Sequence, residues 1–247
     1  MAAVEPDPPE DEGDFVLPRA LEQVVQGLYR RVIEKSEVQL ARPVDIAPSE
    51  YANATLHLRV ATMAESALKD IRALINAYAH AVAEPRPSLQ GVAAAQGVTP
   101  SNLRRRYKPV HVAAVRELLA ERPVVDVVQF AFPSVTDEQL VGLSGALDND
   151  LALRGRIRVA EYDYSVKIFT GVVGAERAQE LAESNTSALV KEWYGASGVA
   201  ARDINNRPLS MLQGPSLEGA TAELGPEYTA YLTRELDAFG VFRRGLN

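Results

Sequence analysis

The sequence predicts a mainly α-helical fold, and three observations support this expectation. Apolar residues recur every three or four positions along several stretches, which is the period of an amphipathic helix. Prolines and glycine-rich stretches separate those segments. The chain has 247 residues, of which 47% are apolar and 24% are charged, a balance typical of globular proteins with a sizeable core.

Residues 1–16 are expected to form a disordered acidic tail. Six of the first fourteen residues are acidic and none is basic, so little apolar surface is present to offset the entropy lost on ordering. A solubilising leader is the simplest role for such a segment. No apolar run approaches the roughly 18–20 residues of a membrane span, and no secretory signal begins the chain. We therefore expect a cytoplasmic protein.

Residues 17–84 are expected to form an amphipathic helical region. After Pro18, which suits the first turn of a helix, one apolar stripe covers residues 21–33. A second apolar stripe covers residues 60–82 of a longer helical segment, which Pro85 ends. Both stripes must face either the core of the protein or a partner chain.

The stretch 91-GVAAAQGVTPSNLRRRYKP-109 predicts two short helices joined by a tight turn. The alanine-rich first helix has little side-chain bulk, so a second helix can cross it closely. Gly97 suits the left-handed backbone conformation that often follows a helix. Thr99 can cap the next helix, and Pro100 fits its first position, where no amide hydrogen is required. Leu103 then returns to the shared core.

This pattern resembles the helix-turn-helix core of bacterial DNA-binding regulators, and is similar to the corresponding run of TetR-like and sigma-factor-like proteins. The resemblance covers about residues 89–107, within a unit that we place at 85–122. Gln96 and Arg106 depart from the pattern, because an apolar residue is usual at both positions. TetR-like architecture as a whole fits poorly, since some 88 residues precede the motif. Five of seven pattern positions match: Val92, Ala93, Gly97, Val98 and Leu103.

In such proteins the N-terminal residues of the second helix contact base edges in the major groove of double-stranded DNA. Arginine can bond guanine, and asparagine can bond adenine, through two hydrogen bonds each. Many of these proteins bind as symmetric dimers, so we expect a homodimer. The resemblance implies phosphate contacts for Thr99 and Lys108. It implies base contacts for four side chains: Ser101, Asn102, Arg104 and Arg105.

Charge is distributed unevenly along the chain. Residues 85–122 carry a net charge of +5, whereas the whole chain carries −7 and the remainder therefore −12. A basic segment in an acidic protein concentrates attraction for polyanions at one place. Chance clustering on a solvated helix face remains the simpler alternative. The chain has 21 arginines and only five lysines, which indicates a GC-rich, bacterial genome. The excess of arginine is therefore not by itself evidence of binding.

Residues 123–247 are expected to form a mostly helical C-terminal region with room for a few short strands. The stretches 123–135 and 154–169 fit a strand and a buried helix almost equally well. This region can mediate assembly or sense a small-molecule or protein effector, and the sequence does not decide between these roles. Three further segments are predicted to be helical: 171–184, 186–194 and 226–239.

We expect no catalytic, metal or cofactor site, and therefore a non-enzymatic protein. The chain has no cysteine, no phosphate loop and no dinucleotide fingerprint. Residues 148-DND-150 begin like a calcium loop but lack its glycine and terminal glutamate, so we interpret them as a turn or helix cap. Glu161 and Asp163 would share a strand face as an exposed acidic edge. His57 and His80 lack neighbouring ligand residues and are interpreted as surface or partly buried imidazoles.

Together these features predict a sequence-specific DNA-binding protein that acts as a bacterial transcriptional regulator. The alternative is a structural or adaptor protein of a larger bacterial, phage or plasmid assembly, in which the helical corner docks another protein. An enzyme with a diffuse carboxylate site would rest on Glu161 and Asp163 alone.

Overall fold

The computed structural model of the protein describes residues 15–40, 50–174, 176 and 215–246. Within these ranges the chain forms ten helices and no strand, which confirms the expected mainly α-helical fold. Both stretches that fitted a strand are helical. They belong to α6 (Val125–Ala131) and α8 (Gly145–Val173). The acidic segment 1–14 and the helices expected within 177–194 lie outside the described residues.

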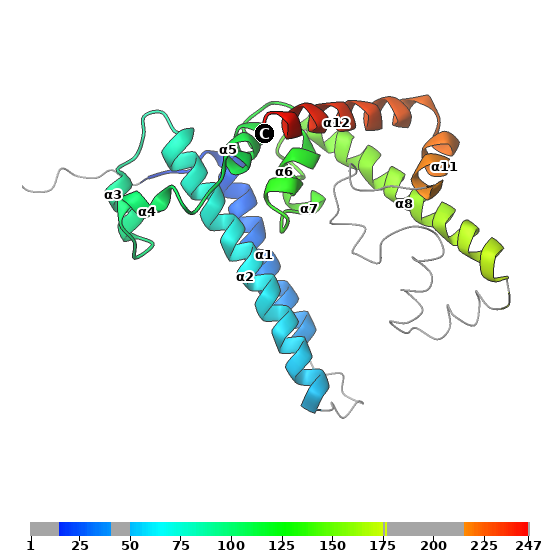
Figure 1. The fold of residues 1–247 in the computed structure, drawn as a ribbon, viewed down its shortest axis with the longest axis horizontal. Helices are drawn as coiled ribbons and strands as arrows, with labels where there is room; N and C mark the ends of the chain where they lie inside the picture. Colours follow the sequence, from blue (N-terminus) through cyan, green and yellow to red (C-terminus); the bar gives the residue numbers. More distant parts are fainter. Residues whose placement is uncertain (1–14, 41–49, 175, 177–214, 247) are drawn as a thin grey trace, which may run out of the picture.

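Helices α1 (Arg19–Leu40) and α2 (Glu50–Ala81) form an antiparallel hairpin that extends beyond the rest of the protein (Figure 1). Leu21 and Leu28 on α1 are fully buried in the same apolar core as Leu74 on α2. Ile33, in the same sequence stripe, is 58% exposed. The last turn of the stripe therefore lies outside this chain's own core, and the other expected alternative, a partner chain, stays a prediction for it. The reason is that the helices packed on the hairpin cover only the half that contains the start of α1.

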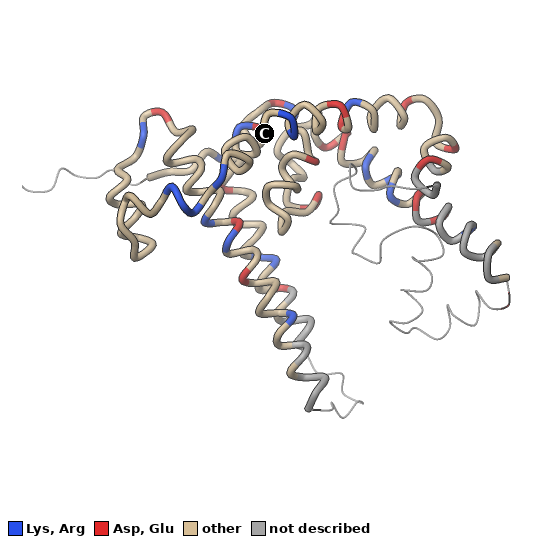
Figure 2. Tube along the Cα trace, viewed as in Figure 1, with Lys and Arg blue, Asp and Glu red and all other residues tan. Residues whose placement is uncertain are grey.

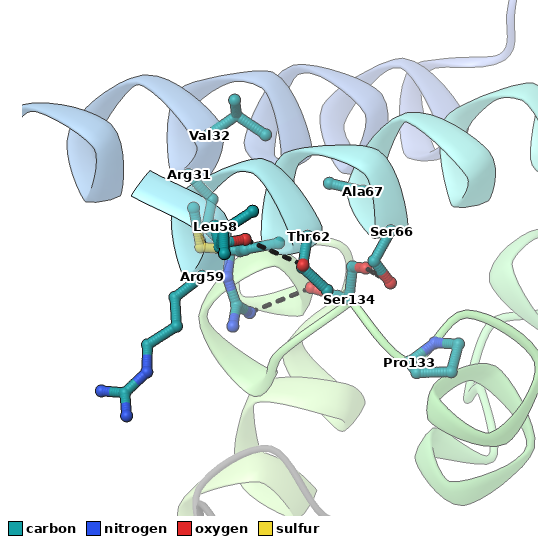
Figure 3. Close-up of a pocket in the computed structure, with 10 residues that line it drawn as sticks. Arg31, Val32, Leu58, Arg59, Thr62, Ser66, Ala67, Pro133 and Ser134 are labelled. Atoms are coloured by element: carbon teal, nitrogen blue, oxygen red, sulfur yellow. Dashed lines mark hydrogen bonds between the residues drawn. The ribbon is translucent and has the colours of Figure 1, made fainter. Parts of the chain in front are cut away.

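Helices α5 (Pro109–Leu118), α6 and α7 (Asp137–Leu140) pack at that end of the hairpin. The turn between α6 and α7 is bound to the hairpin through Ser134 (Figure 3). The Ser134 carbonyl accepts a hydrogen bond of 2.9 Å from Arg31, and its amide donates one of 2.8 Å to Asp70. These bonds satisfy backbone groups that regular secondary structure leaves unpaired. They also explain why Asp70 is buried on an otherwise apolar face.

The C-terminal helices reach away from this body and then return to it (Figure 1). Helix α8 leaves the body, α11 (Pro215–Leu224) packs against it, and α12 (Pro226–Arg244) runs back to α6. The rings of Phe239 on α12 and Phe130 on α6 meet edge to face at 5.3 Å, a favourable aromatic geometry. The C-terminal helix therefore shares the core of the N-terminal hairpin.

A buried ionic cluster joins α6, α7, α8 and α12. The guanidinium group of Arg154 is fully buried and donates to Asp126, also fully buried, at 2.8 Å. It donates to Gln129 at 3.0 Å, and a Glu235 carboxylate oxygen lies 3.6 Å away. Asp137 completes the cluster by pairing with both Arg154 and the neighbouring Arg158. The members of the cluster are Asp126 and Gln129 of α6, Asp137 of α7, Arg154 and Arg158 of α8, and Glu235 of α12.

Two sequence interpretations of acidic residues are wrong. Residues 148–150 lie inside the first turns of α8 rather than in a separate turn. Glu161 and Asp163 lie on a helix, so they cannot share a face at a spacing of two. Glu161 is 1% exposed whereas Asp163 is exposed, and the expected acidic edge does not form. No helix in the described part of the chain has the length and apolar character that crossing a membrane requires.

Candidate nucleic-acid interface

The helical corner that the motif predicted is present. Helix α3 (Leu89–Ala94) is followed by a turn in which Gly97 has φ of 62°, the left-handed conformation that favours glycine. Pro100 then opens α4 (Pro100–Leu103). Leu103 is 1% exposed and packs with Val92 and Ala93 in a small apolar cluster that also includes Ala79 of α2. The corner is therefore docked on the C-terminal end of α2.

Helix α4 is shorter than the motif suggests. It ends at Leu103, and Arg104 and Arg105 lie in the turn that follows rather than on a continuing helix. Pro109 limits how far the helix could continue, because the residue before a proline is disfavoured in the helical conformation. Lys108 precedes Pro109 and is extended, with φ of −124° and ψ of 164°. The chain must therefore leave the helix before α5 can begin.

The first departure from the pattern, Gln96, is explained by a partner on α2. The side chains of Gln96 and Asn76 exchange two hydrogen bonds, of 2.8 and 3.1 Å. Asn76 is 1% exposed, so its amide depends on this pair. The second departure, Arg106, is only half-buried, and the neighbouring Tyr107 packs against the main core instead. The corner thus combines the apolar positions of the sequence pattern with one polar contact to α2.

Replacing Gln96 with leucine would restore the residue type that the pattern favours, but we expect it to destabilise the protein. The buried Asn76 amide would lose its partner, which typically costs about 1–3 kcal/mol. The double variant Asn76→Leu, Gln96→Leu removes both polar groups and should regain most of that loss. Urea unfolding of the two variants tests this expectation. A single Gln96→Leu variant that is more stable than wild type would contradict it.

All six side chains predicted to contact DNA are exposed: Thr99, Ser101, Asn102, Arg104, Arg105 and Lys108. Lysines and arginines are concentrated in the segment between α4 and α5 (Figure 2). Within the described residues, no carboxylate forms an ion pair with any of the cations that we call the basic face. The basic face consists of Arg86, Arg104, Arg105, Arg106, Lys108 and Arg116. Its charges are therefore available to an external polyanion.

His80 of α2 orients Arg104. The Arg104 Nε group donates to His80 Nε2 at 3.4 Å, and the Tyr107 hydroxyl lies 2.5 Å from His80 Nδ1. Because arginine can only donate, His80 Nε2 must be unprotonated, so we assign the proton to Nδ1. Burial lowers the pKa of His80, and the positive charges of Arg104 and Arg86 lower it further. The imidazole is thus neutral at neutral pH, and the two terminal amino groups of Arg104 remain free for a bidentate contact.

A shallow hollow lies beside this histidine, with a volume of about 480 Å³. Arg104, Lys108 and Arg116 contribute its cationic lining, and Tyr107 and Val112 contribute apolar surface. The structure therefore brings Arg116 of α5 next to two predicted site residues. Thr99 occupies the N-cap position of α4 but makes no cap hydrogen bond. Its hydroxyl lies 3.1 Å from that of Ser101 instead, so the expected side-chain cap is wrong.

Arg122 belongs to the basic segment in sequence but not to the basic face. Its guanidinium group donates two hydrogen bonds to Asp150, of 2.7 and 2.8 Å. Arg234 of α12 donates a third bond to the same carboxylate at 2.9 Å. Burial alone would raise the pKa of Asp150, but these bonds from two cations lower it. Part of the net positive charge of residues 85–122 is therefore neutralised by Asp150 of α8.

Sequence reasoning missed three residues of this site: Asn76, His80 and Arg116. Asn76 and His80 lie 20 and 24 residues from their partners in the corner, and no local pattern links such positions. Among the described residues, no three His, Asp or Glu side chains group as a metal ion would require. The chain matches no protein-family model, no curated protein and no solved structure.

Proposed function

We propose that the protein is a sequence-specific DNA-binding protein that acts as a transcriptional regulator. The exposed surface of α4 and the turn after it would enter the major groove of double-stranded DNA. Arg104 and Arg105 would contact guanine, Asn102 would contact adenine, and Lys108 and Arg116 would bind phosphates. In this proposal the protein is bacterial, cytoplasmic and non-enzymatic.

The observation that supports the proposal most is the set of unpaired cations around the oriented Arg104. A guanidinium group oriented by the hydrogen bond to His80 loses less side-chain entropy when it binds a base, so its contact contributes more affinity. The small size of the corner argues for two copies acting together. We therefore propose a homodimer that binds two half-sites about one helical turn apart. The C-terminal helices would then mediate assembly or sense an effector.

One observation favours the alternative function, the docking of another protein. Helix α4 has only four residues, so it presents fewer base-facing positions than a longer recognition helix would. A corner of this size could also pack into a groove on a protein partner. Salt dependence separates the two functions, because phosphate contacts release counterions and neutral docking does not.

Selection of duplexes from a random library tests the DNA-binding proposal. The wild-type protein should enrich an inverted repeat with half-sites roughly 10 base pairs apart. The variant Arg104→Ala, Arg105→Ala should lose that enrichment, and its affinity for the selected duplex should fall at least about 30-fold. The slope of log affinity against log salt should instead fall in the variant Lys108→Ala, by about 1, because that variant removes a proposed phosphate contact.

The variant Arg30→Ala, Arg59→Ala is a matched control. It removes the same number of positive charges from exposed positions on the hairpin, away from the corner. Its selected sequences and its salt slope should equal those of the wild type. The proposal should be abandoned if the wild type and the Arg104→Ala, Arg105→Ala variant recover the same unspecific pool.

A further inference from the structure

We propose that the acidic segment formed by residues 1–14 binds the basic face of the same chain and competes there with DNA. The competition rests on the proposed function, whereas the contact between segment and face does not. The segment would act as an internal polyanion that lowers nonspecific affinity for nucleic acid.

The attachment point of the segment places it beside the basic face. Phe15 stacks on Tyr78 with ring centroids 5.8 Å apart, and it packs against the cluster that contains Ala79 and Leu103. Ala79 directly precedes His80 in the sequence, and Leu103 directly precedes Arg104. His80 and Arg104 both line the shallow hollow described above. Phe15, to which the acidic segment is joined, therefore lies beside the residues that carry the basic face. The sequence had assigned Phe15 to the acidic tail, but its ring is half-buried in the corner.

Length and charge also fit. Fourteen residues span about 45–50 Å when fully extended, which exceeds what is needed to cross the basic face. The segment contains six acidic residues and no lysine or arginine, and the basic face contains six cations. Tethering over so short a distance gives an effective concentration on the order of millimolar, so even weak ionic contacts would be populated. The acids of the segment are Glu5, Asp7, Glu10, Asp11, Glu12 and Asp14.

The basic face offers the segment a better site than the cations that already have carboxylate partners. Arg122, Arg154, Arg158 and Arg234 are already paired with carboxylates. The cations of the basic face have no such partner among the described residues, so binding the segment breaks no existing ion pair. Two exposed carboxylates, Glu84 and Glu121, lie just outside the stretch of sequence that contains the basic face. Charge complementarity therefore directs the segment to this face.

The test uses the full-length protein with the six acids of residues 1–14 changed to their amides. Without DNA and at low salt, we expect the backbone amide resonances of residues 104–108 to shift between wild type and this variant. Raising the salt to about 0.3 M should shift the wild-type resonances toward those of the variant, because it screens the contact. In duplex binding at low salt the variant should gain about 3- to 10-fold in affinity, and the gain should vanish at high salt.

A control variant has six exposed carboxylates elsewhere changed to amides, so that its net charge equals that of the first variant. These positions are Glu34, Glu138, Asp163, Glu176, Glu227 and Asp237. The inference is overturned if the resonances of residues 104–108 do not respond to the tail changes, or if both variants gain the same DNA affinity. Resonance shifts without DNA binding by any variant would support the contact and refute the proposed function instead.

Discussion

Replacing Arg154 with methionine is expected to lower the free energy of unfolding by about 3–5 kcal/mol. The guanidinium group of Arg154 is fully buried and pairs with the fully buried carboxylate of Asp126. Removing the cation alone would leave Asp126 charged and without its counter-ion in a medium where water cannot replace it. The measurement is equilibrium unfolding in urea or guanidinium chloride.

Two further variants show whether the loss comes from the unpaired charge. Arg156→Met changes an exposed arginine two residues away on the same helix and should cost less than about 1 kcal/mol. Asp126→Leu combined with Arg154→Met removes both charges and should recover part of the loss, since apolar replacements of buried ion pairs are often tolerated. If the double variant is less stable than Arg154→Met alone, the explanation by an unpaired charge is wrong.

Changing Glu235 to glutamine is expected to stabilise the protein above pH 7 and to leave it unchanged near pH 5. Burial raises the pKa of Glu235 to about 7 from its usual 4.5, and the charges of Asp126 and Asp150 add to this effect. Arg154 and Arg234 oppose it. The remaining charges of the central cluster, Arg154 and Arg158 against Asp126 and Asp137, already balance, so an ionised Glu235 adds an excess charge.

The sign of the pH dependence follows from proton binding. Between pH 4.5 and about 7 the folded protein holds a proton on Glu235 that the unfolded chain has released. Stability from this group therefore falls as the pH rises through that range, by about 3 kcal/mol in all. The Glu235→Gln variant stays neutral and should exceed the wild type by that amount at pH 8.

Unfolding curves at pH 5 and pH 8 measure this effect, with Asp237→Asn as the control on the exposed face of α12. A constant difference between wild type and Glu235→Gln at both pH values would show that Glu235 does not titrate in this range. Glu235 lies on α12 and its ion-pair partner Arg154 lies on α8, so the same experiment reports on a contact between these two helices.

The ionic contacts also connect the candidate interface to the C-terminal region. Arg122, four residues after the end of α5, and Arg234 on α12 share the carboxylate of Asp150 on α8. The position of α5, which carries Arg116 and follows the basic turn, is thereby tied to helices that the sequence could not assign to a function.

The sequence by itself determined the mainly α-helical class and the corner, although it left residues 123–135 and 154–169 open between strand and helix. Periodicity identifies which face of a helix is buried, so Leu21, Leu74 and Leu103 could be placed in cores before any coordinates. Gly97 and Pro100 fixed the turn through their own backbone preferences.

Only the tertiary structure decided the polar partners. Asn76 with Gln96, His80 with Arg104, and Arg122 with Asp150 are separated by 20, 24 and 28 residues. Buried polar groups must find partners, but which partner is met depends on how whole helices are placed against each other. A buried apolar side chain can pack against many different neighbours, and its burial produces a periodic pattern in the sequence. A side-chain hydrogen bond needs one particular partner, and a partner far away in the chain produces no such pattern.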